Sequence, residues 1–216
     1  MPLASAIVAI AGLVAPLGGR LAIVGASGGL GRELVAQAAE LGVQVDAVML
    51  AQRPLRAPFR GGGLSDRTTE EVPALAPASY TAYDLRSYLQ SGPPCTALVL
   101  ALGGKPFASD VSADVARAVL ESRAAQLERV ALVSARGVNE RTGDPGIAAM
   151  RAVYLRATYR AKAEQERLLA ALPERIERRV SRPPALTYGR APPWVRGVSR
   201  EALAREILQF LCPSGD

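Results

Sequence analysis

Residues 21–35 read LAIVGASGGLGRELV, an apolar run that stops at a glycine-rich turn and continues at once as a helical pattern. Gly25, Gly28 and Gly31 follow a G-x-x-G-x-x-G spacing, not the commoner G-x-G-x-x-G. A buried strand would bring the backbone to a turn with few Cβ atoms, and the helix would point its unpaired N–H groups and positive dipole end into that turn. This order predicts a pyrophosphate site of the dinucleotide-binding type, with a tight structural turn as the alternative.

The rest of the chain alternates apolar runs with helical patterns. Strands are predicted at 21–24, 43–50, 80–83, 95–102, 130–133 and 176–181. Helices are predicted at 29–41, 86–90, 112–126, 148–172 and 200–211. Alternation of this kind predicts an α/β fold, a doubly wound parallel sheet of Rossmann-like type with helices on both faces. Ligands of such sheets bind at the carboxyl ends of the strands.

The chain is predicted to hold one Rossmann-like domain at 19–212, with a small substrate-side segment at its C-terminal end, behind an apolar N-terminal extension at 1–18. Residues 4–15 are almost wholly apolar but too few to span a bilayer, and they lack the positive flank of a signal peptide. We therefore expect no transmembrane protein. A surface helix, a remnant of a targeting segment, and an element that docks on a protein partner or a membrane surface remain as alternatives.

Composition excludes several kinds of chemistry. The 216 residues include no histidine, which removes histidine triads, histidine bases and histidine metal ligands together. Cys95 and Cys212 have no metal-ligand spacing and do not indicate a disulfide framework. We therefore expect no metal and a reducing compartment, either the cytoplasm or an organelle matrix or stroma.

The formal net charge of +6 comes almost entirely from arginine, since Lys105 and Lys162 are the only lysines. A GC-rich genome explains this bias, but such a chain could keep a lysine where a planar guanidinium cannot replace a titrating amine. The arginines are spread along the chain without a basic run interleaved with aromatics, so the pattern does not favour nucleic-acid binding.

Further signals follow the glycine turn in a recognisable order. They are Arg53 closing the second strand, Asp84-Leu85, Ser134 after the fifth strand, Lys162 with Glu166, Arg182-Pro183-Pro184 and Val198-Ser199-Arg200. This order resembles the atypical short-chain dehydrogenase/reductases, and more narrowly the NAD(P)-binding NmrA-like and Tic62-like group, over roughly residues 20–211. The resemblance implies cofactor contacts at Gly25, Ser27, Gly28, Gly29, Leu30, Gly31, Arg53, Asp84, Leu85, Ala101, Gly103 and Lys162.

The second strand bears on the choice of cofactor. In NAD-selective folds it ends in a carboxylate that accepts from the ribose hydroxyls. Here Asp46 lies near the start of the strand and is expected to face elsewhere, whereas Arg53 occupies the closing region. A guanidinium would pair with a 2′-phosphate, so NADP(H) is preferred, with NAD(H) as the alternative. Arg53 could instead be a solvated loop residue, and Asp84 a helix N-cap.

Ser134, Tyr159 and Lys162 are the candidate catalytic residues. In the reductases that this chain resembles, a tyrosine four residues before the lysine exchanges a proton with the substrate, and a serine polarises the carbonyl. Here Thr158 stands four residues before Lys162, and Tyr159 stands three before it, rotated by about 100° around a helix. Tyr159 could therefore be a packing residue, and Lys162 could pair with Glu166 on an exposed helix face.

Two functions follow from these signals. The first is an NADP(H)-binding protein that reduces a small carbonyl-type substrate. The second is a catalytically silent NADP-binding subunit with a structural, redox-sensing or assembly role in a larger complex, which would be reached through a protein partner at residues 4–15. The displaced tyrosine favours the second function.

Overall fold

The computed structural model describes residues 20–50, 55, 80–103, 110–139, 155–188 and 197–213. Six strands form one parallel sheet in the order β3-β2-β1-β4-β5-β6. They are β1 (Leu21–Val24), β2 (Val45–Met49), β3 (Thr81–Asp84), β4 (Ala97–Leu100), β5 (Arg129–Val133) and β6 (Glu177–Ser181). The predicted doubly wound parallel sheet is therefore confirmed. Successive strands are added on one side of β1 up to β3 and on its other side from β4 onward.

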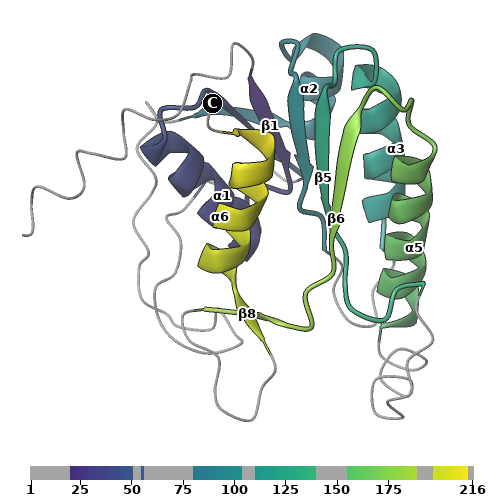
Figure 1. Ribbon diagram of the computed structural model, residues 1–216. Coiled ribbons are helices and arrows are strands. Elements are labelled where there is room, and N and C mark those ends of the chain that lie inside the picture. Colours follow the sequence, from purple (N-terminus) through teal and green to yellow (C-terminus); the bar gives the residue numbers. More distant parts are fainter. Residues whose placement is uncertain are drawn as a thin grey trace, which may run out of the picture.

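Helices cover both faces of this sheet (Figure 1). They are α1 (Gly29–Glu40), α2 (Leu85–Ser91), α3 (Ser112–Arg123), α5 (Arg156–Ala170) and α6 (Arg200–Leu211). The helices α1 and α6 pack on one face, where Leu34 and Ile207 join the side chain of Ile23 in one core. The helices α2, α3 and α5 cover the other face, where Val24 and Leu169 belong to a second core. The two cores account for near-continuous apolar strands, because both faces of each central strand are buried.

Several predicted boundaries are wrong at their ends. Leu155 lies inside the helix predicted at 148–172 but has φ −120° and ψ 17°, so α5 begins only at Arg156. Val43 was predicted as the start of a strand. Its backbone N–H instead donates to the Ala38 oxygen at 3.0 Å, in the turn that follows α1. Gly42, at φ 71°, makes this reversal because glycine adopts left-handed backbone angles without strain.

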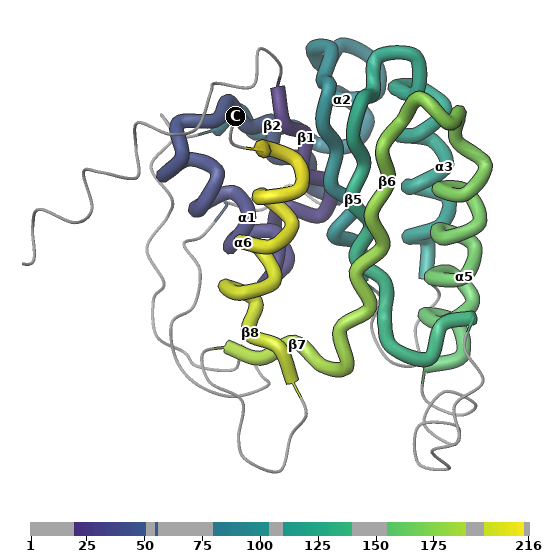
Figure 2. The backbone as a smooth tube through the Cα atoms, viewed as in Figure 1, coloured from purple at the N-terminus to yellow at the C-terminus, as the bar shows by residue number. Residues whose placement is uncertain are grey.

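Other predicted elements differ from the observed ones mainly in being longer by a few residues. The strand predicted at 95–102 is β4, and the helix predicted at 112–126 ends as α3 at Arg123. The helix predicted at 200–211 is confirmed as α6. The short strands β7 (Leu186–Thr187) and β8 (Val198–Ser199) were not predicted. They pair in parallel and lie beyond the end of β6 (Figure 2).

Some expectations concern residues outside the described part of the chain. These are the apolar extension at 1–18, Arg53, and the first residues of the helix predicted at 148–172. Within the described ranges, no helix combines the length and the apolar character that crossing a membrane requires. The same ranges hold no group of three or more acidic or cysteine side chains arranged to bind a metal ion.

Candidate functional site

The glycine turn joins β1 to α1 and is closed by backbone contacts. Gly25 has φ 93°, and a Cβ there would lie 2.6 Å from the backbone oxygen of Ala101. Its N–H donates to the backbone oxygen of Val48 at 2.9 Å, and Gly28 donates to the Gly25 oxygen at 3.0 Å. Any side chain at Gly25 would therefore collide with the end of β4, which explains the first glycine of the motif.

The N-terminus of α1 faces out of this turn. Arg32 donates the first helical hydrogen bond, to Gly28 at 2.9 Å, so the N–H groups of residues 29–31 have no acceptor within the helix. Gly28 is the N-cap but offers no side chain, and the first turn holds no acidic residue. A Cβ at Gly31 would lie 2.2 Å from the Gly25 oxygen, so the helix packs directly on the turn. Free N–H groups and an uncompensated positive dipole end suit a pyrophosphate group.

The other predicted residues of this motif differ in exposure. Gly28 is exposed, and Ser27 and Gly29 are half-buried. Leu30 is buried, and its side chain joins the core under α1. Only the backbone of Leu30 could therefore contact a ligand, whereas the half-buried Ser27 is not part of this core.

The end of β4 lies beside the turn. Ala101 donates its N–H to the Val24 oxygen at 2.9 Å, which holds the two strand ends together. Gly103 is exposed, and a Cβ added there would meet nothing within 4 Å. No contact within the described residues requires glycine at 103, so open space lies over this position.

The acidic residues near β2 and β3 are occupied by local partners. Asp46 is fully buried, pairs with Arg20 at 2.8 Å, and stands beside Ala22 in the register of the sheet. It therefore faces away from the carboxyl ends of the strands, as predicted. Asp84 caps α2 by accepting from the N–H of Ser87 at 2.9 Å and from its hydroxyl at 2.7 Å.

These hydrogen bonds lower the pKa of Asp84, first through the Ser87 backbone N–H. The N-cap alternative for Asp84 is confirmed. Leu85, the first residue of α2, is half-buried against the second core.

Lys162 lies inside the molecule and not on an exposed face. Its side chain is 4% exposed and donates to the backbone oxygens of Leu102 and Val133, which follow β4 and end β5. Burial lowers its pKa to about 8, against the opposing charges of Asp110 and Glu166. The alternative of an exposed Lys162–Glu166 pair is wrong, because tertiary packing turns this face of α5 toward the sheet. An ammonium group has three N–H donors, and two of them are used by these contacts with the described residues.

Ser134 follows β5 directly and is 5% exposed. Its backbone N–H donates to the Ser181 oxygen at 2.8 Å, but its hydroxyl has no hydrogen-bond partner among the described residues. The hydroxyl helps to lower the pKa of Glu166, although it does not meet that carboxylate at normal hydrogen-bond geometry. An unpaired buried hydroxyl is costly, and such groups are typical of sites that await a ligand.

Tyr159 lies one turn before Lys162 on α5. Its hydroxyl donates to the backbone oxygen of Arg136 at 2.9 Å, in the loop that follows β5. The structure thus engages this phenol with the main chain, which fits the packing alternative.

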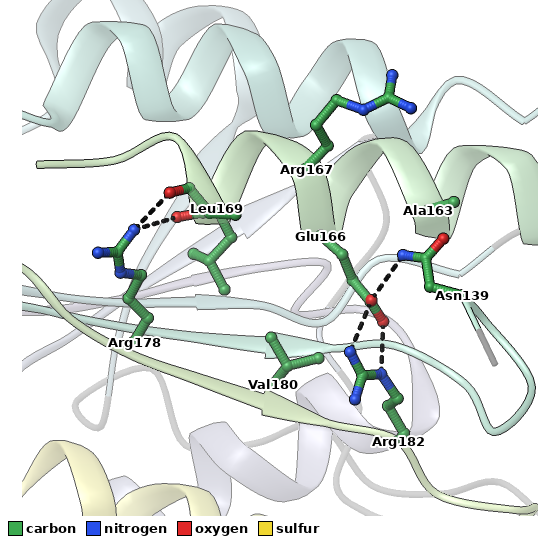
Figure 3. A pocket seen from close by; sticks show the side chains of 9 residues that line it. Asn139, Ala163, Glu166, Arg167, Leu169, Arg178, Val180 and Arg182 are labelled. Carbon is green, nitrogen blue, oxygen red and sulfur yellow. Dashed lines mark hydrogen bonds and ion pairs between the residues drawn. The ribbon is translucent and has the colours of Figure 1, made fainter.

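Glu166 forms a polar network that the sequence did not reveal. Its carboxylate accepts from Arg182 at 2.9 and 2.8 Å and from Asn139 at 3.0 Å (Figure 3). Burial alone would raise the pKa of Glu166, but these donors lower it. Asn139 has φ 56°, a left-handed angle that asparagine tolerates better than most residues.

A hollow of about 580 Å³ lies beside this network, between α5 and β6 (Figure 3). Its lining residues are Asn139, Ala163, Glu166, Arg167, Leu169, Ala170, Arg178, Val180 and Arg182. None of the predicted cofactor contacts lines it. Because β4 and β5 separate β6 from β1 in the sheet, this hollow is distinct from the glycine turn.

Tyr188 and Arg200 also reach the glycine turn, although neither was predicted as a site residue. A Cβ at Gly29 would lie 2.4 Å from the Tyr188 hydroxyl and 2.8 Å from Nε of Arg200. Arg200 appeared only as part of the Val198-Ser199-Arg200 signal, and nothing local marked Tyr188. Both come from segments more than 150 residues away along the chain from Gly29.

The parallel sheet with its glycine turn at the β1–α1 junction defines a Rossmann-like nucleotide-binding protein. The sequence matches the model of the NAD(P)H-binding family over residues 25–208, so the chain belongs to that family. Its fold is that of the atypical short-chain dehydrogenase/reductases. The predicted resemblance is confirmed at this level.

Solved structures with the same fold include several reductases of low sequence identity. A short-chain dehydrogenase/reductase from Serratia marcescens aligns with a TM-score of 0.60 and 15% identity, covering 92% of this chain and 93% of its own. The anaerobillin reductase ChuY from Escherichia coli O157:H7 aligns with a TM-score of 0.58 and 16% identity, covering 88% and 89%. Vestitone reductase from alfalfa aligns with a TM-score of 0.56 and 14% identity, covering 89% and 73%. The curated protein sequences contain no significant match.

Proposed function

We propose that the protein binds NADP(H) and uses it to reduce a small carbonyl-type substrate. The single observation that carries the catalytic part is Ser134, whose buried hydroxyl lacks a partner among the described residues. It stands next to Val133, whose backbone oxygen accepts from Lys162. A hydroxyl in this place can donate to a substrate carbonyl and stabilise the negative charge that develops there.

The cofactor would be held at the carboxyl ends of the central strands. The N–H groups of residues 29–31 would bind the pyrophosphate, and Ala101 and Gly103 would allow close approach of the ribose. The third N–H of Lys162 would donate to the nicotinamide ribose. When bound, the nicotinamide supplies the hydride that adds to the carbonyl carbon. The proton for the carbonyl oxygen would come from solvent water, because the Tyr159 phenol donates to the backbone oxygen of Arg136.

The preference for NADP(H) rests on charge at the end of β2. The only carboxylate of that strand, Asp46, is buried against Arg20 and cannot repel a 2′-phosphate. Arg53, four residues after the strand ends at Met49, supplies a guanidinium that can pair with this phosphate. In this proposal Asp84 and Leu85 border the adenine.

A second function, NADP(H) binding without catalysis, is favoured by Tyr159. In that case the protein would be a structural, redox-sensing or assembly subunit that docks through its apolar N-terminal residues. The Tyr159–Arg136 hydrogen bond supports this alternative, because it removes the usual proton donor of the reductases.

One set of measurements separates the two functions. NADPH and NADH binding to the full chain is measured by protein fluorescence, and NADPH oxidation is followed at saturation across a panel of aldehydes, ketones and quinones. The reductase function predicts that at least one panel member causes NADPH oxidation. It also predicts that Ser134→Ala loses this oxidation but still binds NADPH. Binding without turnover on any panel member would support the silent subunit. Absence of binding to either dinucleotide would contradict both functions.

A further inference from the structure

The C-terminal part of the chain closes against the first residue of α1. A Cβ on Gly29 would stand 2.4 Å from the Tyr188 hydroxyl and 2.8 Å from Nε of Arg200, so both side chains touch this glycine. Tyr188 is 5% exposed. Both groups can approach the backbone of Gly29 this closely because glycine has no side chain. The contact places a guanidinium at the mouth of the glycine turn.

The local structure around Arg200 fixes this placement. The strand β8 pairs with β7, and Ser199 then caps α6 by accepting from the Ala202 N–H at 3.1 Å. Arg200 is therefore the first residue of α6, and α6 packs alongside α1 (Figure 1). The guanidinium carbon lies 3.9 Å from the centre of the Tyr188 ring, a cation–π contact that holds the side chain over Gly29.

The guanidinium of Arg200 brings a full positive charge beside the N-terminus of α1, which carries a partial positive charge of its own. The first turn of α1 holds no acidic residue. A diphosphate bound at this helix N-terminus would be attracted by both positive groups.

We propose that Arg200, held in place by the Tyr188 ring, binds the pyrophosphate of the dinucleotide together with the N–H groups of α1. The segment from β7 to the start of α6 then forms one wall of the dinucleotide site. This inference rests on the proposed NADP(H) binding. It adds a guanidinium from the C-terminal segment to a site that the glycine motif alone would build from backbone.

The test compares Arg200→Gln with Arg205→Gln in the full chain. Both variants remove one positive charge from α6, but Arg205 is 60% exposed and lies one turn away. Dissociation constants are measured for NADPH, ADP and adenosine 2′-monophosphate. Arg200→Gln should weaken NADPH and ADP by about 30-fold, the loss expected for one hydrogen bond to a charged group. It should leave adenosine 2′-monophosphate unchanged, and Arg205→Gln should bind all three like the native chain.

Thermal melting checks that each variant folds, and Arg200→Lys provides a second variant that keeps the charge but loses the planar fork. It should bind NADPH with intermediate affinity. Native-like NADPH and ADP binding by Arg200→Gln would overturn the role of Arg200, as would equal losses in the two glutamine variants. Failure of the native chain to bind NADPH or NADH would instead overturn the proposed function on which this inference rests.

Discussion

The hydroxyl of Tyr159 donates to the backbone oxygen of Arg136 at 2.9 Å. This contact ties α5 to the loop after β5 and engages the phenol one turn before the buried Lys162. A proton donor of the usual reductase kind would have to break this hydrogen bond before it could serve a substrate. We therefore expect Tyr159 to act in packing, whereas Ser134 is the residue proposed to donate to a substrate carbonyl.

Replacing Tyr159 with phenylalanine should have little effect on catalysis. Loss of one partly exposed hydrogen bond should lower the free energy of unfolding by about 1 kcal/mol. NADPH oxidation should change less than about twofold, whereas Ser134→Ala should lower the turnover number by about 100-fold. Steady-state kinetics with the best panel substrate measures both. Loss of turnover in Tyr159→Phe with native-like turnover in Ser134→Ala would reverse the two assignments.

Replacing Lys162 with methionine should change the pH dependence of stability. The pKa of Lys162 is lowered from 10.5 to about 8 in the folded protein, so between these values the unfolded chain binds more protons. The free energy of unfolding of the native chain should therefore rise from pH 8 to pH 10.5, by up to about 3 kcal/mol relative to Lys162→Met.

Urea unfolding at a series of pH values measures this difference. At pH 7 Lys162→Met should itself be less stable by about 2 kcal/mol, because the oxygens of Leu102 and Val133 lose their donor. Lys105→Met is the matched control, since it removes the only other lysine. Parallel pH curves for the native chain and Lys162→Met would show that Lys162 is not perturbed.

Replacing Arg182 with methionine should destabilise the protein at neutral pH. The Glu166 carboxylate, 6% exposed, would lose both hydrogen bonds from the Arg182 guanidinium and keep the one from Asn139. We expect a loss of about 2 kcal/mol, below the range for fully buried pairs because Arg182 is 38% exposed. Because the pKa of Glu166 is lowered, this contribution is present above its ordinary value of 4.5 and is lost as the pH falls through the folded value.

Urea unfolding at pH 7 and pH 3.5 tests the prediction, and the gap between native chain and variant should narrow at the lower pH. Arg179→Met is the matched control on the same strand. Its partner Glu206 is 51% exposed, so we expect a loss of at most about 0.5 kcal/mol. Equal losses in the two variants would contradict a special role for the Glu166 pair.

Two glycine-to-alanine changes should differ in their effect on stability. Gly31→Ala places a Cβ 2.2 Å from the Gly25 oxygen and should lower the free energy of unfolding by about 3 kcal/mol. Gly103→Ala meets open space and should change stability by less than about 0.5 kcal/mol. If the ribose lies over residue 103, the same change should weaken NADPH binding. Unaltered affinity in Gly103→Ala would remove this residue from the proposed site.

The fold followed from local patterns. Hydrophobic runs and helical periodicity are properties of neighbouring residues, and they located six strands and five helices in the right order. Boundaries were less accurate, because Leu155 and Val43 depart from helix and strand through backbone angles and hydrogen bonds that the pattern does not encode. The strands β7 and β8, at two residues each, were too short to show a period.

The site was only partly visible in the same way. The glycine turn could be predicted because strand, turn and helix are contiguous in the chain. The engagement of Tyr159 by Arg136, the burial of Lys162 and the arrival of Tyr188 and Arg200 at Gly29 could not be predicted. Each depends on how segments far apart in the chain are packed.

Residues 21–35 alone thus defined a strand, a glycine-rich turn and a helix N-terminus, since these depend on backbone geometry and nearest neighbours. Which side chains surround that turn was decided by folding. Packing of α6 along α1 brings Arg200 to Gly29, and packing of α5 on the sheet buries Lys162 against two strand ends. The physical reason is that long-range contacts are selected by burial and charge in the assembled molecule, and a linear pattern holds no record of them.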